Sequence, residues 1–118
     1  MDKLIVELLI DEEHTNCKKT LHGGQTAALT DIITSLHTAV VVRDKAFVSV
    51  ELSASYILPV KIGELIEIES KIIRIGRKLI FTEIEFRRKF DGAIVVKGKH
   101  LLSLVNNANN ANYNEILR

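Results

Sequence analysis

The sequence predicts an α+β fold in which an antiparallel β-sheet buries one long apolar helix. Three observations support this. The length of 118 residues and a hydrophobic content of 47% fit one globular domain. Residues 24–42 have the pattern of a single helix. Four segments rich in Ile and Val follow it, and their short links favour antiparallel neighbours. A disordered or fibrous chain is therefore disfavoured.

The first element expected is a strand over residues 3–11, KLIVELLID. Its apolar residues alternate, which predicts a half-buried strand whose inner side carries Leu4, Val6, Leu8 and Ile10. Residues 12–23, EEHTNCKKTLHG, are polar and run into a glycine pair. This segment predicts a loop that leads into the helix.

The helix is expected from Gly24 to about Val42. Its apolar residues cover most of the helical circumference, so we expect burial on nearly every side. These residues are Ala27, Ala28, Leu29, Ile32, Ile33, Leu36, Ala39 and Val40.

Four strands are expected after the helix, over residues 46–58, 64–75, 79–89 and 93–105. In the first of these, one apolar face is expected from Val48, Val50, Leu52, Ala54, Tyr56 and Leu58. The breaks carry turn residues, and Asp91-Gly92 is a hairpin signal. We therefore place the domain at residues 1–105. The Asn-rich segment 106–118 has little to bury, so we expect it to be disordered.

Composition disfavours several classes of function. Lys and Arg total 16 and Asp and Glu total 15, with no basic block of the kind that nucleic acid binding needs. No stretch approaches the ~18 apolar residues of a membrane span. The single cysteine, Cys17, suits a reducing compartment, so we expect the cytosol and leave the mitochondrion open. The four histidines show no metal-ligand spacing, and no metal is predicted.

One carboxylate stands out in the expected helix. Between Lys19 and Arg43 the only charged residue is Asp31. A buried carboxylate is costly unless it is paired, hydrogen-bonded or protonated. Asp31 could be structural, bonded to a core hydroxyl or facing solvent, or it could be functional. A polar stripe formed by Asp31, Thr34, Ser35 and Thr38 indicates a wet interface or cleft.

The glycine pair before the helix is a second candidate site. Gly23-Gly24 follows Leu21-His22, and the first N–H groups of a helix lack internal partners, so they can receive a developing negative charge. The alternative is a tight turn without a role. Asp31 lies eight residues beyond Gly23, which places the two backbones about 12 Å apart on one helix. A two-fold dimer with paired helices would bring Asp31 of one chain near Gly23 of the other, so if the chain is an enzyme we expect its site to be shared between subunits.

The residues that carry these features also carry a resemblance. The sequence resembles the hot-dog-fold acyl-CoA thioesterases of the phenylacetate-degradation and thioesterase-member-2-like branch. The resemblance covers about residues 3–105 and rests on the runs HTNCKKTLHGGQTAALTDIITS, VSVELSASYILPVKIGELIEIESKIIRIGRKLIF and GKHLLSL. It implies a sheet wrapped around one helix, and homo-oligomers in which dimers pair their helices and then form tetramers.

The resemblance also implies an activity and its residues. It implies hydrolysis of acyl-CoA to a carboxylic acid and CoA, within fatty acid metabolism and without a further cofactor. Position by position, Gly23 becomes the oxyanion donor, beside His22. Asp31 from the neighbouring subunit becomes the general base or nucleophile, and the sequence does not choose between these roles. Asn16 would hold the thioester or the attacking water, and Ser49 would partner the carboxylate.

A basic turn is the expected CoA contact. The resemblance implies this role for Arg74, Gly76, Arg77 and Lys78, whose cationic side chains suit phosphates, and it gives pocket-lining positions to Tyr56 and Leu79. A solvated hairpin is the alternative. A rival function for the whole domain is a non-catalytic acyl-CoA or lipid-binding module of the same fold.

Overall fold

The structure is a computed structural model that describes residues 3–11, 23–43 and 45–105. Six elements follow one another along the chain: β1 (Lys3–Leu9), α1 (Gly23–Val41), β2 (Ala46–Tyr56), β3 (Leu65–Ile75), β4 (Leu79–Arg88) and β5 (Ile94–Val105). The expected order of one strand, one helix and four strands is confirmed. Asn16, His22 and the Asn-rich segment lie outside the described residues, so their expected roles stay predictions.

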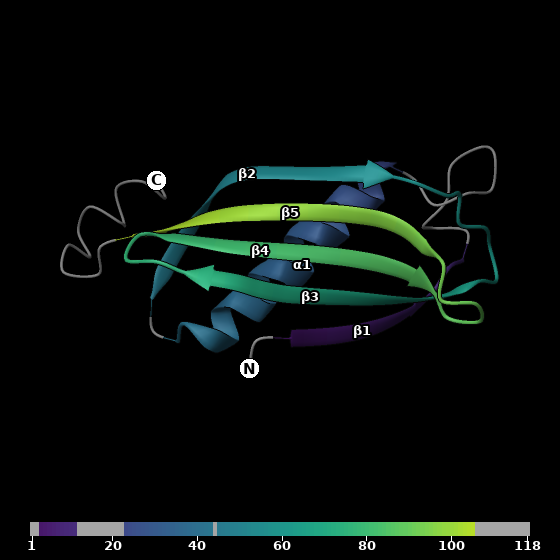
Figure 1. Cartoon of the computed structure of the whole chain (residues 1–118), viewed down its shortest axis with the longest axis horizontal. Coiled ribbons are helices and arrows are strands. Elements are labelled where there is room, and N and C mark those ends of the chain that lie inside the picture. The colour runs from purple at the N-terminus through teal and green to yellow at the C-terminus, as the bar shows by residue number, and fades with distance from the viewer. Residues whose placement is uncertain (1–2, 12–22, 44, 106–118) are drawn as a thin grey trace.

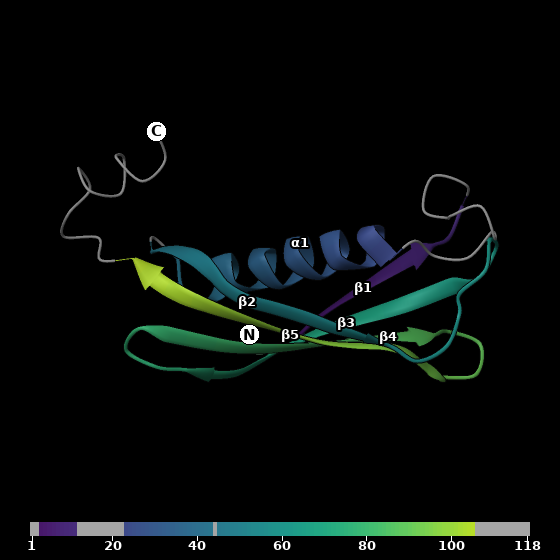
Figure 2. The same cartoon turned by 90° about the horizontal axis from the view of Figure 1, so that it is seen from above.

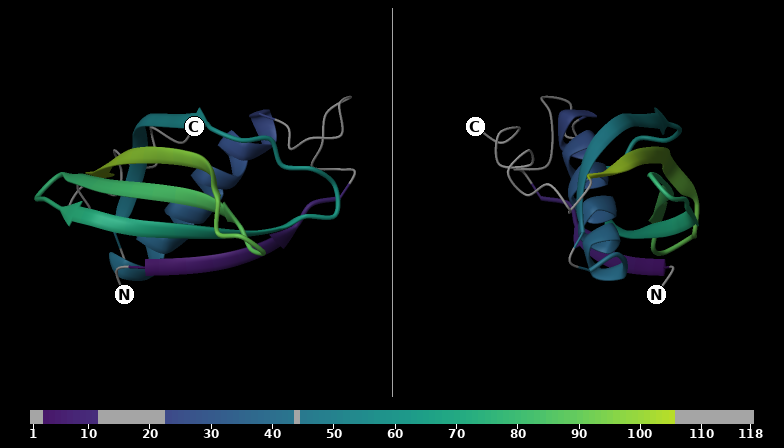
Figure 3. Two further views of the ribbon diagram at one scale, coloured as in Figure 1. Left: turned by 45° about the vertical axis from the view of Figure 1, so that its right-hand side comes forward. Right: turned by 90° about the vertical axis from the view of Figure 1, so that its left-hand side faces the viewer.

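The five strands form one sheet in the order β1-β3-β4-β5-β2, and every pairing is antiparallel. Figure 1 shows the strands side by side with α1 behind them. Seen from above, the helix lies on one face of the sheet only (Figure 2). The sheet curves around that helix (Figure 3, right). The predicted α+β architecture is therefore confirmed.

The turns follow the expected chemistry. Gly92 adopts a φ of 73° in the hairpin between β4 and β5, a conformation that glycine accepts without strain. Beside it, the Ala93 amide donates to Asp91 Oδ1 at 3.0 Å. The turn between β3 and β4 is closed by the Gly76 amide, which donates to the Leu79 carbonyl at 2.7 Å.

The core lies between α1 and the inner face of the sheet. The inner side chains of β1 pack against it, as the alternation in that strand predicts, while Leu9 on the outer side is 58% exposed. Burial of each such apolar side chain contributes about 1.5–3 kcal/mol. The main cluster comprises Ile10, Ile33, Val60, Ile66, Ile68, Ile84, Phe86, Val95 and Val96.

The expectation that α1 is buried on nearly every side is wrong for the single chain. Ile32 is 62% exposed and Leu36 55% exposed. The face of α1 that is buried carries Thr26, Thr30, Thr34, His37 and Thr38. Threonine is accepted there because three of the hydroxyls donate to the carbonyl four residues back, at 2.9, 2.7 and 2.8 Å, and so need no water.

This arrangement also corrects the expected polar stripe. Thr34 and Thr38 are fully buried, whereas Asp31 is exposed and Ser35 half-buried. The four residues therefore occupy two sides of the helix. Asp31 is no buried carboxylate in the single chain, and its burial would require a second molecule.

The expected single apolar face of β2 is also wrong. The register between β2 and β5 shifts between Ser49 and Glu51, which marks a bulge. An extra residue in a strand exchanges the faces beyond it. Ser49 therefore opposes buried Leu102 on the helix side, and Leu52 opposes His100 on that same side. Val48 and Val50 leave this face and are 41% and 55% exposed.

Candidate active site

His100 links the sheet to the helix at the centre of the candidate site. Its ring is fully buried on β5, where His100 stands between Leu52 of β2 and Thr82 of β4. Nδ1 lies 2.7 Å from Thr34 Oγ1 on α1, and Nε2 lies 2.8 Å from Ser49 Oγ on β2. One imidazole thus joins three elements through both of its nitrogens.

The direction of these hydrogen bonds follows from the proton count. The Thr34 hydroxyl already donates its one proton to the Thr30 carbonyl at 2.7 Å. His100 Nδ1 therefore carries a proton and donates it to Thr34 Oγ1. Nε2 of the neutral ring is then an acceptor, and the Ser49 hydroxyl donates to it. The lone pairs of Ser49 Oγ are left to accept a further hydrogen bond.

Burial lowers the pKa of His100 below its ordinary value of 6.5, and the negative charge of Asp31 acts in the opposite direction. Desolvation has the larger effect, because it penalises the imidazolium directly. The ring is therefore neutral at pH 7, in agreement with the hydrogen bonds.

Asp31 faces outward from the middle of α1. Its Oδ1 accepts a hydrogen bond from Ser35 Oγ, one turn further along the helix, at 3.1 Å. Within one chain the Ser49 hydroxyl donates its one proton to His100 and has none left for a carboxylate, so the expected partnership of Ser49 with a carboxylate stays a prediction. In the single chain Asp31 is solvent-exposed, so a second molecule could contact it.

Gly23 is the first residue of α1, and Asp31 stands on the same helix. With a rise of about 1.5 Å per residue, their backbones lie about 12 Å apart. The helix N-terminus suits a developing anion. The two groups cannot reach one carbon from a single chain, as the sequence predicts.

The basic turn and Tyr56 lie at opposite ends of the sheet. Tyr56 opposes Val96, whereas the Leu104 amide donates to the Lys78 carbonyl at 2.6 Å. Val96 and Leu104 stand on one strand, roughly 26 Å apart. Arg77 and Lys78 are exposed, and Tyr56 is 58% exposed. One chain therefore does not bring the expected CoA-contacting residues together in a single pocket.

A second buried histidine packs one turn after Thr34. His37 Nδ1 lies 2.9 Å from Ser70 Oγ on β3, so the expectation of a satisfied helix residue is confirmed. Among residues 3–11, 23–43 and 45–105, no three His, Cys, Asp or Glu side chains come together as a metal site.

The sequence did not identify His100 as part of the site, and it placed Thr34 in a polar stripe with Asp31 and not against a histidine. The contact between Thr34 and His100 joins positions 66 residues apart, which no local pattern can show. A weak signal was present: His100 lies in the run GKHLLSL, next to leucines in a strand that is largely buried. A histidine at such a position needs hydrogen-bond partners.

A sequence model described as the thioesterase superfamily matches residues 18–94 of the chain. The chain belongs to the thioesterase superfamily. The expected hot-dog fold is thereby confirmed, and thioesterase superfamily member 2 of zebrafish superposes with a TM-score of 0.84. That structure is 35% identical in sequence, over 88% of this chain and 75% of the other.

Two further proteins are similar to this chain over most of its length. Human acyl-coenzyme A thioesterase 13 is 38% identical over 104 residues, which cover 88% of this chain and 74% of the human protein. A Caenorhabditis elegans protein named as a candidate esterase is 50% identical over 105 residues, or 89% of this chain. The match spans only 62% of the length of that relative.

Among the described residues, no helix is long and apolar enough to cross a membrane.

Proposed function

We propose that this thioesterase-superfamily protein hydrolyses acyl-CoA to a carboxylic acid and CoA, at a site built from two copies of the chain. The observation that carries the proposal is the placement of Asp31. This carboxylate is exposed on α1, near a neutral His100 that fixes the Ser49 hydroxyl. The relative named acyl-coenzyme A thioesterase 13 supports the choice of substrate.

Two exposed features support the pairing of chains. On α1, Ile32, Leu36 and Val40 form an apolar stripe with exposed fractions of 62%, 55% and 42%. Beside it, β2 is one of the two edge strands of the described sheet and pairs there only with β5, as β1 pairs only with β3 at the other edge. Long exposed edge strands invite pairing with another chain. A second copy would extend the sheet along β2 and cover the helical stripe.

The proposed reaction follows from the placement of Gly23 of one chain beside Asp31 of the other. The thioester carbonyl would sit at the Gly23 amide of one chain, where the helix N-terminus stabilises the oxyanion. Asp31 of the other chain would take a proton from water as the water oxygen attacks the carbonyl carbon. Collapse of the tetrahedral intermediate then breaks the C–S bond and releases CoA as a thiolate, which is a good leaving group.

A covalent route uses the same groups. Asp31 would attack the carbonyl itself, form an acyl anhydride with loss of the CoA thiolate, and be freed by water. In both routes Ser49 would orient the water, because its proton is held by His100 and its lone pairs are available. Asn16 and His22 keep the roles that the resemblance implies.

Recognition of CoA is proposed for Arg74, Arg77 and Lys78, because guanidinium and ammonium groups suit phosphates. Gly76 suits this turn, because an added Cβ would lie 3.2 Å from the Leu79 carbonyl oxygen, a tight contact. Tyr56 lies at the other end of the sheet. It would therefore line the acyl-CoA pocket of one of the two sites of the dimer, while the basic turn of the same chain would contact CoA at the other site. The single cysteine favours a cytosolic setting.

A thiol-release assay across short, medium, long and aryl acyl-CoAs tests the proposal. We expect Asp31→Asn to lower kcat by roughly 100-fold or more, because the base or nucleophile is lost. Asp91→Asn is the matched control, since it changes an exposed carboxylate in the β4–β5 hairpin. CoA binding should persist in both variants. Equal rates for wild type and Asp31→Asn would remove Asp31 from the mechanism, and binding without turnover in wild type would favour the non-catalytic module.

A further inference from the structure

A chain of hydrogen bonds runs from the edge of the sheet into the core beneath α1. It begins at Ser49 on β2, which is exposed in the single chain. It passes through both ring nitrogens of His100 and reaches Thr34 on α1, with 2.8 Å between Ser49 Oγ and Nε2 and 2.7 Å between Nδ1 and Thr34 Oγ1. His100 and Thr34 are fully buried, so solvent does not reach either side chain.

The inner end of this chain is an acceptor that cannot donate. Thr34 Oγ1 lies 2.7 Å from the Thr30 carbonyl oxygen and 3.4 Å from that of Asp31. A carbonyl oxygen has lone pairs and no proton, so a proton of Thr34 must stand between the two oxygens that are 2.7 Å apart. The direction of every other bond in the chain follows from this end.

The opposite direction does not fit the same distances. It would require Thr34 to donate to Nδ1, which would leave two lone pairs facing each other between Thr34 Oγ1 and the Thr30 carbonyl. A doubly protonated ring is disfavoured too, because burial lowers the pKa of His100. Thr82 Oγ1 donates to the His100 carbonyl at 2.8 Å, so the backbone that carries the ring is also held.

We propose that Thr34 is a positioning residue for the reaction, because it fixes the tautomer of His100 and thereby the direction of the Ser49 hydroxyl. With Thr34 in place, Nδ1 carries the ring proton and Ser49 presents only lone pairs to the site. The effect on turnover rests on the proposed function, whereas the tautomer does not.

The proposed hydrolysis uses this direction. The attacking water would give one proton to Asp31 of the other chain and keep the second, which donates a hydrogen bond to Ser49 Oγ. The kept proton stays on the oxygen that becomes part of the carboxylic acid. The proton taken by Asp31 passes to the CoA thiolate or to solvent, which restores the carboxylate.

Thr34→Val would reverse the direction at Ser49. Valine keeps the branched shape but places a methyl group where the hydroxyl stood, so a proton on Nδ1 would have no acceptor. A buried N–H without a partner is rarely tolerated, so the proton should move to Nε2 and be donated to Ser49 Oγ. The Ser49 hydroxyl would then turn its own proton toward the site, where the water needs an acceptor.

Nitrogen-15 NMR of the imidazole rings tests the tautomer, because protonated and unprotonated ring nitrogens resonate far apart. His100→Gln identifies the signals of His100 by their loss. At pH 7.5 we expect a proton on Nδ1 in wild type and in Thr34→Ser, which keeps the hydroxyl, and on Nε2 in Thr34→Val. Thr38→Val is the matched control: it removes a buried hydroxyl-to-carbonyl bond one turn further along α1, of 2.8 Å, and should leave the proton on Nδ1.

Turnover of the best acyl-CoA substrate tests the consequence. Thr34→Val should lower kcat roughly tenfold, because the water is misplaced, while Thr34→Ser and Thr38→Val should keep the wild-type kcat. In a Ser49→Ala background, Thr34→Val should lower kcat no further, since Thr34 acts only through Ser49. A merely structural Thr34 would instead give losses that multiply in the double variant.

Each remaining result counts for or against the inference. A proton on Nε2 of His100 in wild type overturns it without any variant, so a Thr34→Val protein that does not fold leaves the test intact. A proton that stays on Nδ1 in folded Thr34→Val overturns the role of Thr34, and multiplied losses of kcat overturn its action through Ser49. A wild type that binds acyl-CoA without hydrolysing it contradicts the proposed function alone, and the tautomers of wild type and Thr34→Val still decide this inference.

Discussion

A single imidazole sets the geometry of the candidate site. His100 holds Ser49 from β2 and Thr34 from α1 in fixed orientations, without a charge of its own at pH 7. Asp31 was predictable from the sequence because it is the lone charge in an apolar helix. His100 was not, because its importance depends on two partners that the fold brings from distant segments.

His100 should make the protein sensitive to mild acid. Its folded-state pKa is lowered by burial, so below about pH 6.5 the unfolded state binds a proton that the folded state does not. Stability is therefore full above pH 6.5 and falls as the pH drops toward the folded-state pKa. His100→Gln should lower the free energy of unfolding at pH 7.5 by about 1–3 kcal/mol. In urea titrations, the free energy of unfolding of this variant should fall less between pH 7 and pH 5.5 than that of wild type. An equal fall with pH in both proteins would contradict the assigned pKa direction.

Ser49 should matter less than Asp31. Its proposed role is to orient water, so we expect Ser49→Ala to lower kcat roughly 10- to 100-fold while the variant stays folded. Ser53→Ala, an exposed change on the same strand, is the control and should leave kcat unchanged. Complete loss of turnover in Ser49→Ala, with Asp31→Asn still active, would instead identify Ser49 as the nucleophile.

At the scale of elements, α1 shows that hydrophobic periodicity can locate a helix without indicating its buried face. Apolar residues surround the helix, so the pattern located it but did not indicate which side meets the sheet. Threonine counts as polar in such a pattern, yet its hydroxyl is satisfied within the helix and its methyl group packs inward. The bulge in β2 likewise changes which residues face the helix in a way that the sequence pattern does not show. One inserted residue places Ser49 on the helix side.

The exposed stripe of α1 gives a prediction for this element. Leu36→Asp should cost little folding free energy in the single chain, since Leu36 is 55% exposed. It should however separate the paired helices, halve the molar mass of the assembly and lower kcat/KM by roughly 100-fold or more. Leu36→Met is the apolar control. An unchanged mass together with unchanged activity would show that the stripe is not an interface.

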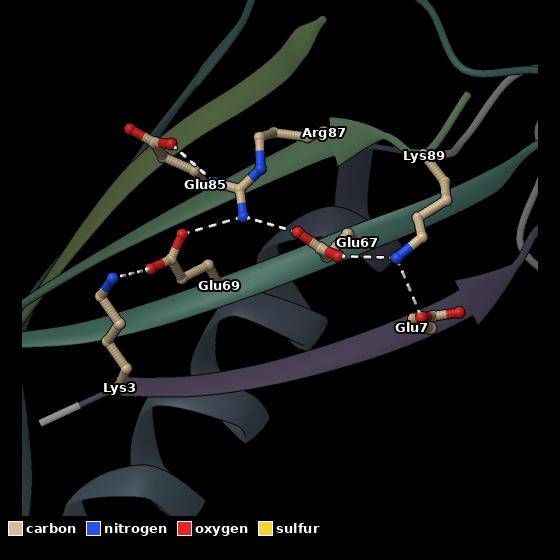
Figure 4. A network of polar contacts seen from close by, with 7 residues as sticks. All are labelled: Lys3, Glu7, Glu67, Glu69, Glu85, Arg87 and Lys89. Carbon is tan, nitrogen blue, oxygen red and sulfur yellow. Dashed lines mark hydrogen bonds and ion pairs between the residues drawn. The ribbon is translucent and has the colours of Figure 1, made fainter. Parts of the chain in front are cut away.

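At the scale of the whole molecule, an ion-pair network on the face opposite α1 ties β1, β3 and β4 together (Figure 4). Arg87 pairs with Glu67, Glu69 and Glu85. Further ion pairs join Lys3 to Glu69, and Lys89 to Glu7 and Glu67.

Hydrogen bonds from Arg87 and Lys89 lower the pKa of Glu67. Burial alone would raise the pKa of Glu69, but Arg87 and Lys3 outweigh it and the net direction is down. Both carboxylates therefore stabilise the fold above about pH 4.5, and this stability is lost as the pH falls through their folded-state pKa values.

Arg87→Met should remove much of the dependence of stability on acidic pH. Without the guanidinium, Glu67, Glu69 and Glu85 repel one another, so Tm at pH 7 should fall. The further loss of Tm between pH 5 and pH 3 should be smaller than in wild type. A variant that loses as much Tm in acid as wild type would show that the network does not set acid stability.

The whole assembly was only partly predictable. A short chain and the distance between Gly23 and Asp31 indicated a second copy, since one helix cannot place both groups on one carbon. The ion-pair network on the face opposite α1 gave no such signal, because its residues are far apart along the chain and meet only through the strand register.

Hybrid dimers test the shared site most directly. Asp31→Asn removes the base, and Gly23→Pro removes the amide donor at a helix position that tolerates proline. Each variant alone should be inactive. Co-expressed in equal amounts, half of the dimers would be mixed, and each mixed dimer would hold one site with both groups intact. We predict about a quarter of the wild-type rate; a rate no greater than the summed residual rates of the two variants would contradict a site shared between chains.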